Sequence, residues 1–150
     1  MTTCEYAAIL TPSSKGAVRK ALTASFLLYA RRRTRREAGT PLIKSEGAEA
    51  VRTLRREVPG KKIIADTKTM DTGSFEVEIM AKAGADIVTV LGLADDATIE
   101  EAVMAGRKYG AEVMVDMINV PDRVERAKRV EALGASYICM HMGIDTQMRG

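Results

Sequence analysis

The sequence predicts an α/β fold, an incomplete (β/α)8 barrel, on three observations. Short apolar runs rich in β-branched residues alternate with stretches of helical periodicity along most of the chain. The junctions repeat, because a glycine precedes successive runs at Gly60, Gly84, Gly110 and Gly134, at spacings of 24, 26 and 24 residues. No GxGxxG or Walker-type phosphate loop follows any run, which favours a closed barrel over an open nucleotide-binding sheet.

Each run is apolar on both faces, as a buried parallel strand is. A degenerate strand ending at Glu37 precedes four clearer ones, which we expect to end at Asp66, Leu91, Asp116 and His141.

Helical periodicity predicts helices over 45–57, 73–83, 97–109 and 122–133. The expected N-caps are Ser45 and Asp96. Pro121 is expected to open the last helix, where a missing N–H loses no hydrogen bond. The glycines that follow the helices are expected to adopt the left-handed conformation that ends a helix.

The length of the chain limits the number of βα units. Eight units of about 25 residues need about 200 residues, whereas 150 residues leave room for about six. We therefore expect either a gene fragment or a sheet completed by a second copy. Residues 1–36 are predicted to be an atypical basic head in place of the first βα unit, and residues 37–150 a partial barrel domain.

The charge distribution supports this division. Residues 1–36 contain eight Lys or Arg and one acid, whereas residues 37–150 contain fifteen basic and nineteen acidic side chains. Arginine clusters bind nucleic acid or anionic lipid in other proteins. No aromatic residues alternate with the arginines here, so nucleic-acid binding is not the prediction.

Composition excludes several protein classes. The chain is 46% hydrophobic, 29% charged and 4% aromatic, as ordinary domains are. No segment approaches the roughly 18 apolar residues of a membrane-spanning helix. Two cysteines without CxxC spacing and a single histidine exclude a structural zinc site. Reduced thiols and a cytoplasmic location are the expectation.

Ionisable residues stand where predicted strands end, at Glu37, Asp66, Asp116 and His141. In a barrel of this kind the carboxyl ends of the strands carry the chemistry. Scattered surface charges would fall mainly on helices, whereas each of these residues follows an apolar run. A carboxylate buried there needs a cation or hydrogen-bond donors.

The densest polar group is Ala65–Asp71. Strand alternation is expected to place Asp66 and Lys68 on one side, with Asp71 in the following loop. A lysine between two acids stays charged and oriented and leaves one carboxylate for a metal, which suits enediolate stabilisation and proton transfer. A salt bridge closing the barrel rim, and a merely hydrogen-bonded His141, remain alternatives. For Glu37 and Asp116 taken singly, structural capping is the alternative.

Four motifs occur in order along the chain: Glu37–Gly47, Ala65–Asp71, Val115–Val120 and His141–Asp145. Together they closely resemble the 3-hexulose-6-phosphate synthase family of the orotidine 5'-monophosphate decarboxylase superfamily. The superfamily signature is an Asp-x-Lys-x-x-Asp array after the third strand. The resemblance extends over residues 37–150.

The resemblance implies a (β/α)8 barrel that condenses formaldehyde with D-ribulose 5-phosphate to D-arabino-hex-3-ulose 6-phosphate. It also implies Mg²⁺ and a homodimer with shared active sites. Magnesium suits the ligand set independently, because it prefers a few carboxylates with substrate oxygens and water. The implied roles are metal ligation by Glu37 and Asp66, enediolate stabilisation by Lys68, a contact across the dimer by Asp71, proton transfer at C1 by His141, and substrate or outer contact by Asp116.

Two departures from the family pattern stand out. The first strand of the superfamily ends in an aspartate, whereas Tyr6–Leu10 is followed by Thr11 and Pro12. A frameshifted or mis-started head would explain this, and upstream DNA without an alternative frame joined to Glu37 would refute it. The last two βα units, which supply the glycine-rich phosphate-binding segment in this superfamily, are not seen, so weak or no binding of the sugar phosphate by the isolated chain is expected.

Two other functions compete with this one. The first is 3-keto-L-gulonate 6-phosphate decarboxylase, whose histidine is followed three residues later by an arginine. Ile144 occupies that place here, which favours the aldol reaction. The second is a catalytically silent barrel fragment that acts only as a dimerising module, since unpaired strand edges favour association.

Overall fold

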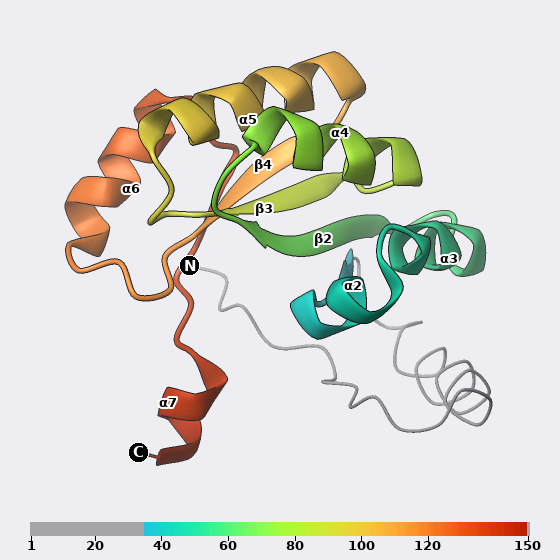
Figure 1. The fold of residues 1–150 in the computed structure, drawn as a ribbon, viewed down its shortest axis with the longest axis horizontal. Helices are drawn as coiled ribbons and strands as arrows, with labels where there is room; N and C mark the ends of the chain where they lie inside the picture. Colours follow the sequence, from blue (N-terminus) through green and yellow to red (C-terminus); the bar gives the residue numbers. More distant parts are fainter. Residues whose placement is uncertain (1–34, 150) are drawn as a thin grey trace.

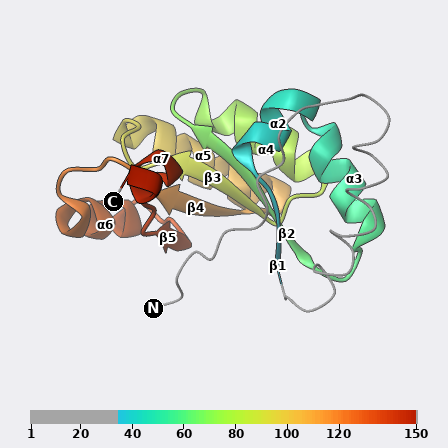
Figure 2. The same ribbon diagram turned by 90° about the horizontal axis from the view of Figure 1, so that it is seen from below.

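The computed structural model of the chain describes residues 35–149. Five parallel strands form one sheet in the order β1-β2-β3-β4-β5, so each strand pairs with its neighbours in sequence. Helices connect the strands, and α3 and α6 lie toward opposite ends of the sheet (Figures 1 and 2). The described residues are thus an α/β unit of an incomplete (β/α)8 barrel, as predicted.

The strands coincide with the predicted apolar runs but differ at their ends. β2 continues three residues past Asp66, because an irregularity in the strand lets Thr69 pair with Val90 of β3. β5 ends two residues before His141, whose backbone N–H bonds to the Cys139 carbonyl and turns the chain out of the sheet. The strands are β1 (Arg35–Ala38), β2 (Lys62–Thr69), β3 (Ile87–Leu91), β4 (Glu112–Asp116) and β5 (Tyr137–Cys139).

The helices also follow the prediction with one error. The helix predicted over 45–57 is wrong: the chain forms two helices, separated at Gly47, whose φ of 62° ends the first. A short helix also occupies the C-terminal segment. The helices are α2 (Thr40–Glu46), α3 (Glu49–Glu57), α4 (Gly73–Ala83), α5 (Asp96–Tyr109), α6 (Arg123–Ala132) and α7 (Ile144–Arg149).

Three predicted helix starts are displaced. Ser45 lies inside α2 rather than at its N-cap, because the helix starts earlier, with a proline in its first turn. Asp95 is the N-cap of α5, and Asp96 is its first residue. Asp122 caps α6 by accepting a backbone N–H in the first turn, so Pro121 precedes the cap. For α5 and α6, adjacent polar or turn-forming residues compete for the cap, and the helix start shifts by only one residue.

Glycines do end the helices as expected. Gly84, Gly110 and Gly134 all have φ between 78° and 106°, which an L side chain adopts only with strain. Gly60, at the first of the four junctions, does not have a positive φ. Gly73 has a different role: a Cβ there would lie 2.2 Å from the Thr98 carbonyl oxygen, so the start of α4 approaches α5 closely.

The core lies between the sheet and the helices and is built mainly from aliphatic side chains. β3 is almost wholly buried, as a central parallel strand should be. Fully buried side chains include Val51, Ile63, Val77, Val88, Val90, Ile99, Val115 and Val130.

The predicted basic head lies outside the described residues, apart from its last two. Arg35 and Arg36 belong to β1, so this strand starts two residues before the predicted domain boundary. The expectation of a strand at Tyr6–Leu10 also falls outside the described residues. Within residues 35–149, no helix has the length and apolar character needed to cross a membrane.

Candidate active site

An irregularity in β2 determines how the polar residues of this strand are placed. Ala65 pairs with Val88 and Thr69 with Val90, so four steps along β2 match only two along β3. Within this bulge Lys68 has a φ of 51°, in the left-handed region that non-glycine residues seldom occupy. Asp66 and Lys68 do reach the same side, as predicted, but through the bulge rather than through regular alternation.

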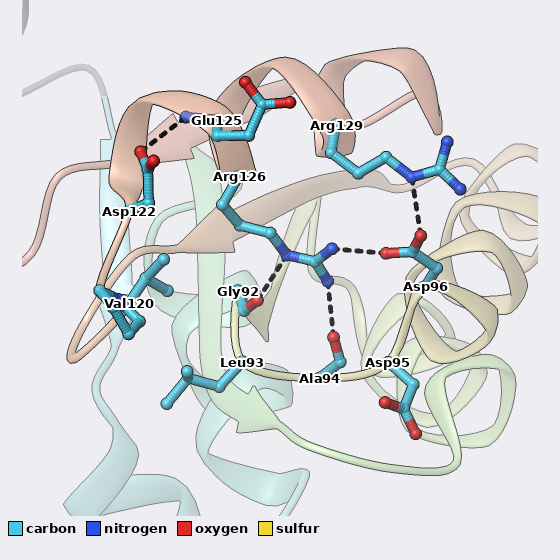
Figure 3. Close-up of a pocket in the computed structure, with 11 residues that line it drawn as sticks. Gly92, Leu93, Ala94, Asp95, Asp96, Val120, Asp122, Glu125, Arg126 and Arg129 are labelled. Carbon is cyan, nitrogen blue, oxygen red and sulfur yellow. Dashed lines mark hydrogen bonds and ion pairs between the residues drawn. The ribbon is translucent and has the colours of Figure 1, made fainter.

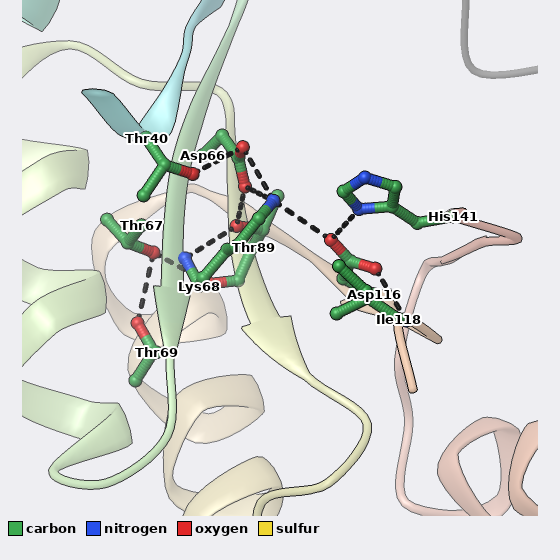
Figure 4. A network of polar contacts seen from close by, with 9 residues as sticks. All are labelled: Thr40, Asp66, Thr67, Lys68, Thr69, Thr89, Asp116, Ile118 and His141. Atoms are coloured by element: carbon green, nitrogen blue, oxygen red, sulfur yellow. Dashed lines mark hydrogen bonds and ion pairs between the residues drawn. The ribbon is translucent and has the colours of Figure 1, made fainter. Parts of the chain in front are cut away.

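Lys68 forms ion pairs with two buried carboxylates (Figure 4). Its Nζ lies 2.8 Å from Asp66 Oδ2 and 3.1 Å from Asp116 Oδ2. Burial lowers the pKa of Lys68, but hydrogen bonds and charge from the two aspartates raise it further, so the net shift is upward. The ammonium therefore remains charged and points toward the space at the carboxyl ends of β2 and β4.

The second acid beside Lys68 is Asp116, not Asp71. Asp71 lies exposed in the loop after β2, where its carboxylate accepts the backbone N–H of Thr72. The left-handed conformation of Lys68 directs its side chain toward β4, which sequence spacing alone does not reveal. Within the single chain, then, the structure does not bring Asp71 to Lys68.

Asp66 is held by three donors. Thr40 Oγ1 donates to Oδ2 at 2.7 Å, Thr89 Oγ1 donates to Oδ1 at 2.8 Å, and Lys68 Nζ contacts both oxygens. Burial raises the pKa of Asp66, but the bonds from Lys68, Thr40 and Thr89 lower it by more, so the carboxyl ionises below its usual range. It is a fixed, charged carboxylate.

Asp116 connects Lys68 to the histidine. His141 Nδ1 lies 2.7 Å from Asp116 Oδ2, and the backbone N–H of Ile118 donates to Oδ1 at 2.9 Å. Asp116 and His141 are 2% and 7% exposed. Because a carboxylate can only accept, Nδ1 donates the hydrogen bond in this pair.

Glu37 lies beside this cluster, near enough to Asp66, Lys68 and Asp116 for their charges to act on it. Burial raises the pKa of Glu37 to about 7, the charge of Asp66 adds to this, and Lys68 opposes it. No hydrogen-bond donor within residues 35–149 reaches its carboxylate. The position therefore favours a proton or a cation on Glu37.

The donor chemistry fits a divalent cation. Glu37, Asp66 and Asp116 bring three carboxylates close to one ammonium, so the ionised cluster carries excess negative charge. No three acidic, histidine or cysteine side chains in the described part of the chain converge on one point. Magnesium does not need that, because it binds through one or two carboxylates and keeps water or substrate oxygens on its other positions.

A separate pocket opens beside the cluster, between the loops after β3 and β4 (Figure 3). It has a volume of about 630 Å³, and none of its lining residues belongs to the Lys68 cluster. Arg126 crosses it and donates to the carbonyls of Gly92 and Ala94 and to Asp96. Arg129 also donates to Asp96, at 2.7 Å. Both arginines thus tie α6 to the start of α5, Arg126 also ties α6 to the loop after β3, and the pocket presents no unpaired cation to a ligand.

Comparison with known protein families identifies the family to which this cluster of residues belongs. Residues 30–150 match the orotidine 5'-phosphate decarboxylase / HUMPS family. The chain belongs to this family. The match includes every predicted site residue, from Glu37 to His141.

Similar proteins of this family refine the relationship. The chain is 48% identical over 114 residues to a 3-hexulose-6-phosphate synthase of Bacillus subtilis, covering 76% of this chain and 54% of that protein. It is 48% identical over 113 residues to the Mycobacterium gastri protein of the same name, covering 75% and 55%. The predicted resemblance is therefore confirmed, and the chain spans about half the length of the curated relatives it matches.

Solved structures of similar proteins have the same fold as the described residues. A crystal structure of 3-hexulose-6-phosphate synthase superimposes with a TM-score of 0.79 at 46% identity, covering 83% of this chain and 61% of that one. The 3-keto-L-gulonate-6-phosphate decarboxylase of Vibrio cholerae superimposes with a TM-score of 0.77 at 30% identity, covering 89% and 61%. The synthase and the decarboxylase thus share this fold, and the synthase has the higher sequence identity to the chain.

Two residues that bind Asp66 were not predicted from the sequence. Thr40 and Thr89 both donate to Asp66, yet neither stands at a predicted strand end. Thr40 follows Glu37 closely in a segment that is part of the family motif, which was a usable signal. Thr89 is the polar residue in the buried run Ile87–Leu91, and a hydroxyl in such a run needs a partner.

Proposed function

We propose that this chain carries the catalytic centre of a 3-hexulose-6-phosphate synthase. It would condense formaldehyde with D-ribulose 5-phosphate to give D-arabino-hex-3-ulose 6-phosphate. The observation that carries the proposal is the continuous contact Asp66–Lys68–Asp116–His141, which joins a fixed cation to a proton carrier. The names of the relatives supply the substrates.

Lys68 stabilises the enediolate. Removing a proton from C1 of ribulose 5-phosphate leaves negative charge shared between C1 and the C2 oxygen, and an ammonium held between two carboxylates is already oriented to meet the charge on that oxygen. Its raised pKa keeps the charge in place at neutral pH. Because Asp66 and Asp116 hold the ammonium before substrate arrives, little reorganisation accompanies the reaction.

His141 moves the proton. With Nδ1 hydrogen-bonded to Asp116, Nε2 takes the proton from C1. The C1 carbanion then attacks the formaldehyde carbon and forms the new C–C bond. The proton on Nε2 passes to the former formaldehyde oxygen, so the step is balanced and His141 returns to its starting state. Asp116 acts in this scheme by orienting His141 and Lys68.

Glu37 and Asp66 are the residues that would hold Mg²⁺. When bound, the ion would supply Lewis-acid stabilisation of the enediolate oxygens. The excess carboxylate charge and the raised pKa of Glu37 support this assignment. Asp71, exposed after β2, would contact the active site of a second copy in a homodimer. We also infer a cytoplasmic location, where the thiol of Cys139 stays reduced.

The decarboxylase alternative uses the same array of Asp66, Lys68 and Asp71. The two functions are therefore distinguished here by the residue that stands three positions after His141. Ile144 begins α7, three residues after His141, and offers no cation for a carboxylate substrate. This favours the aldol reaction.

The test is direct. The purified 150-residue chain, with Mg²⁺, ribulose 5-phosphate and ¹³C-formaldehyde, is followed by ¹³C NMR for a new hydroxymethyl carbon. We expect product that disappears in Lys68→Met and persists in the exposed control Lys82→Met. Substrate is used at millimolar concentration, because weak phosphate binding is expected. Absence of product in the wild-type chain, with retained oligomerisation, would instead support a silent dimerising module.

A further inference from the structure

Thr89 makes an unusual set of contacts with the bulge of β2. Its neighbours Val88 and Val90 pair with Ala65 and Thr69 in the strand register, whereas Thr89 itself has no register partner in β2. The bulge nevertheless bonds to Thr89 in three ways, and all three involve a side-chain oxygen.

The first two bonds use the Thr89 hydroxyl. It accepts the backbone N–H of Lys68 at 3.1 Å and donates to Asp66 Oδ1 at 2.8 Å. One hydroxyl offers one donor and two acceptor positions, so both bonds form together. In the third bond, Thr67 Oγ1 donates to the Thr89 carbonyl at 2.6 Å. These bonds replace the backbone pairs that the bulge removes.

The Thr89 side chain is well suited to this position. It is 4% exposed, and its β-branch restricts χ1, so the hydroxyl has little freedom to turn away. The Lys68 backbone is left-handed, a conformation that persists only where surrounding contacts maintain it. The bond from Lys68 N–H to Thr89 is such a contact, and it lies directly at the strained residue.

We infer that Thr89 is a positioning residue, whose hydroxyl joins the left-handed backbone of Lys68 to the carboxylate of Asp66. Through this one oxygen, Lys68, which carries the ammonium, and Asp66, which binds it, are held in a fixed position relative to each other. Thr89 acts through both and does not contact substrate. Its effect on turnover rests on the proposed function, whereas its effect on the Lys68 backbone does not.

The first test measures the Lys68 amide directly. Thr89→Val keeps the β-branched shape and removes the hydroxyl, Thr89→Ser keeps the hydroxyl, and Thr69→Val is a matched control, since Thr69 is buried but bonds to Thr67 and Glu76 instead. Amide hydrogen exchange is followed by NMR on the 150-residue chain. We expect the Lys68 amide to exchange about tenfold faster in Thr89→Val. It should be close to wild type in Thr89→Ser and in the control.

The second test measures turnover by the same variants. Thr89→Val should lower kcat by about tenfold with KM nearly unchanged, because only the orientation of Lys68 and Asp66 is altered. Thr89→Ser should restore kcat, which a purely structural threonine would not require.

The outcomes separate the two claims. Unchanged Lys68 exchange in a folded Thr89→Val would overturn the role of Thr89, whether or not the chain turns over. Lack of product in the wild-type chain would overturn the proposed function, and the exchange result would still decide about Thr89. If Thr89→Val and Thr89→Ala both fail to fold while Thr69→Val folds, the hydroxyl serves general stability and the inference is overturned.

Discussion

Replacing Glu37 by glutamine tests the electrostatics of the site without any assumption about substrate. In the folded chain the pKa of Glu37 is raised from 4.5 to about 7 by burial and by the charge of Asp66. Between these two values the folded state binds more protons at Glu37 than the unfolded state does, so this residue makes stability fall as pH rises. The contribution is small below pH 4.5 and reaches its full size above pH 7.

The size of the effect follows from the shift. A difference of about 2.5 pKa units at about 1.36 kcal/mol each is roughly 3 kcal/mol, an upper limit because Glu37 is only half-buried. Glutamine cannot ionise, so Glu37→Gln should be more stable than wild type at pH 8 by up to about 3 kcal/mol in EDTA. At pH 4.5 the advantage should nearly vanish.

Magnesium should reverse the order. A cation on Glu37 and Asp66 removes the repulsion, so saturating Mg²⁺ should stabilise the wild-type chain at pH 8 and leave Glu37→Gln nearly unchanged. Urea unfolding followed by circular dichroism measures each free energy, with the exposed Glu46→Gln as control. If Glu37→Gln shows the same stability as wild type at both pH values in EDTA, the burial and repulsion assigned to Glu37 are wrong.

Three further changes test other parts of the structure. Asp116→Asn removes the charge that orients His141 and Lys68, and should lower kcat by about 10²-fold or more, measured by ¹³C product formation; a change in KM alone would contradict this. Gly73→Ala places a Cβ against a carbonyl oxygen of α5 and should destabilise the chain by about 2–4 kcal/mol in urea, whereas Gly60→Ala, with open space around it, should be within about 0.5 kcal/mol of wild type. Arg126→Met leaves two loop carbonyls unpaired and should lower stability by about 1–3 kcal/mol; equal losses in the more exposed Arg129→Met would show that the carbonyl bonds are unimportant.

The parts of the fold that were predictable are those set by local chemistry. The left-handed glycines Gly84, Gly110 and Gly134 follow their helices, because only glycine enters this conformation without strain. The buried strands followed from runs of β-branched residues. The break at Gly47 was missed, because the same glycine is also compatible with a continuous amphipathic helix.

The site was partly predictable for a similar reason. Asp66, Lys68, Asp116 and His141 were identified, because parallel strands bring their carboxyl ends to one edge. Which acid pairs with the lysine was not, since that depends on a bulge whose geometry arises from pairing between β2 and β3. Thr89 was missed because a strand pattern distinguishes polar from apolar residues but not a bonded hydroxyl from a tolerated one.

A single oxygen atom, Asp116 Oδ2, receives both the ammonium of Lys68 and the ring of His141. A change at Lys68 or at His141 therefore alters how strongly this oxygen binds the other residue. Single substitutions at Lys68 and His141 will therefore not combine additively, because both residues act on the same Asp116 oxygen.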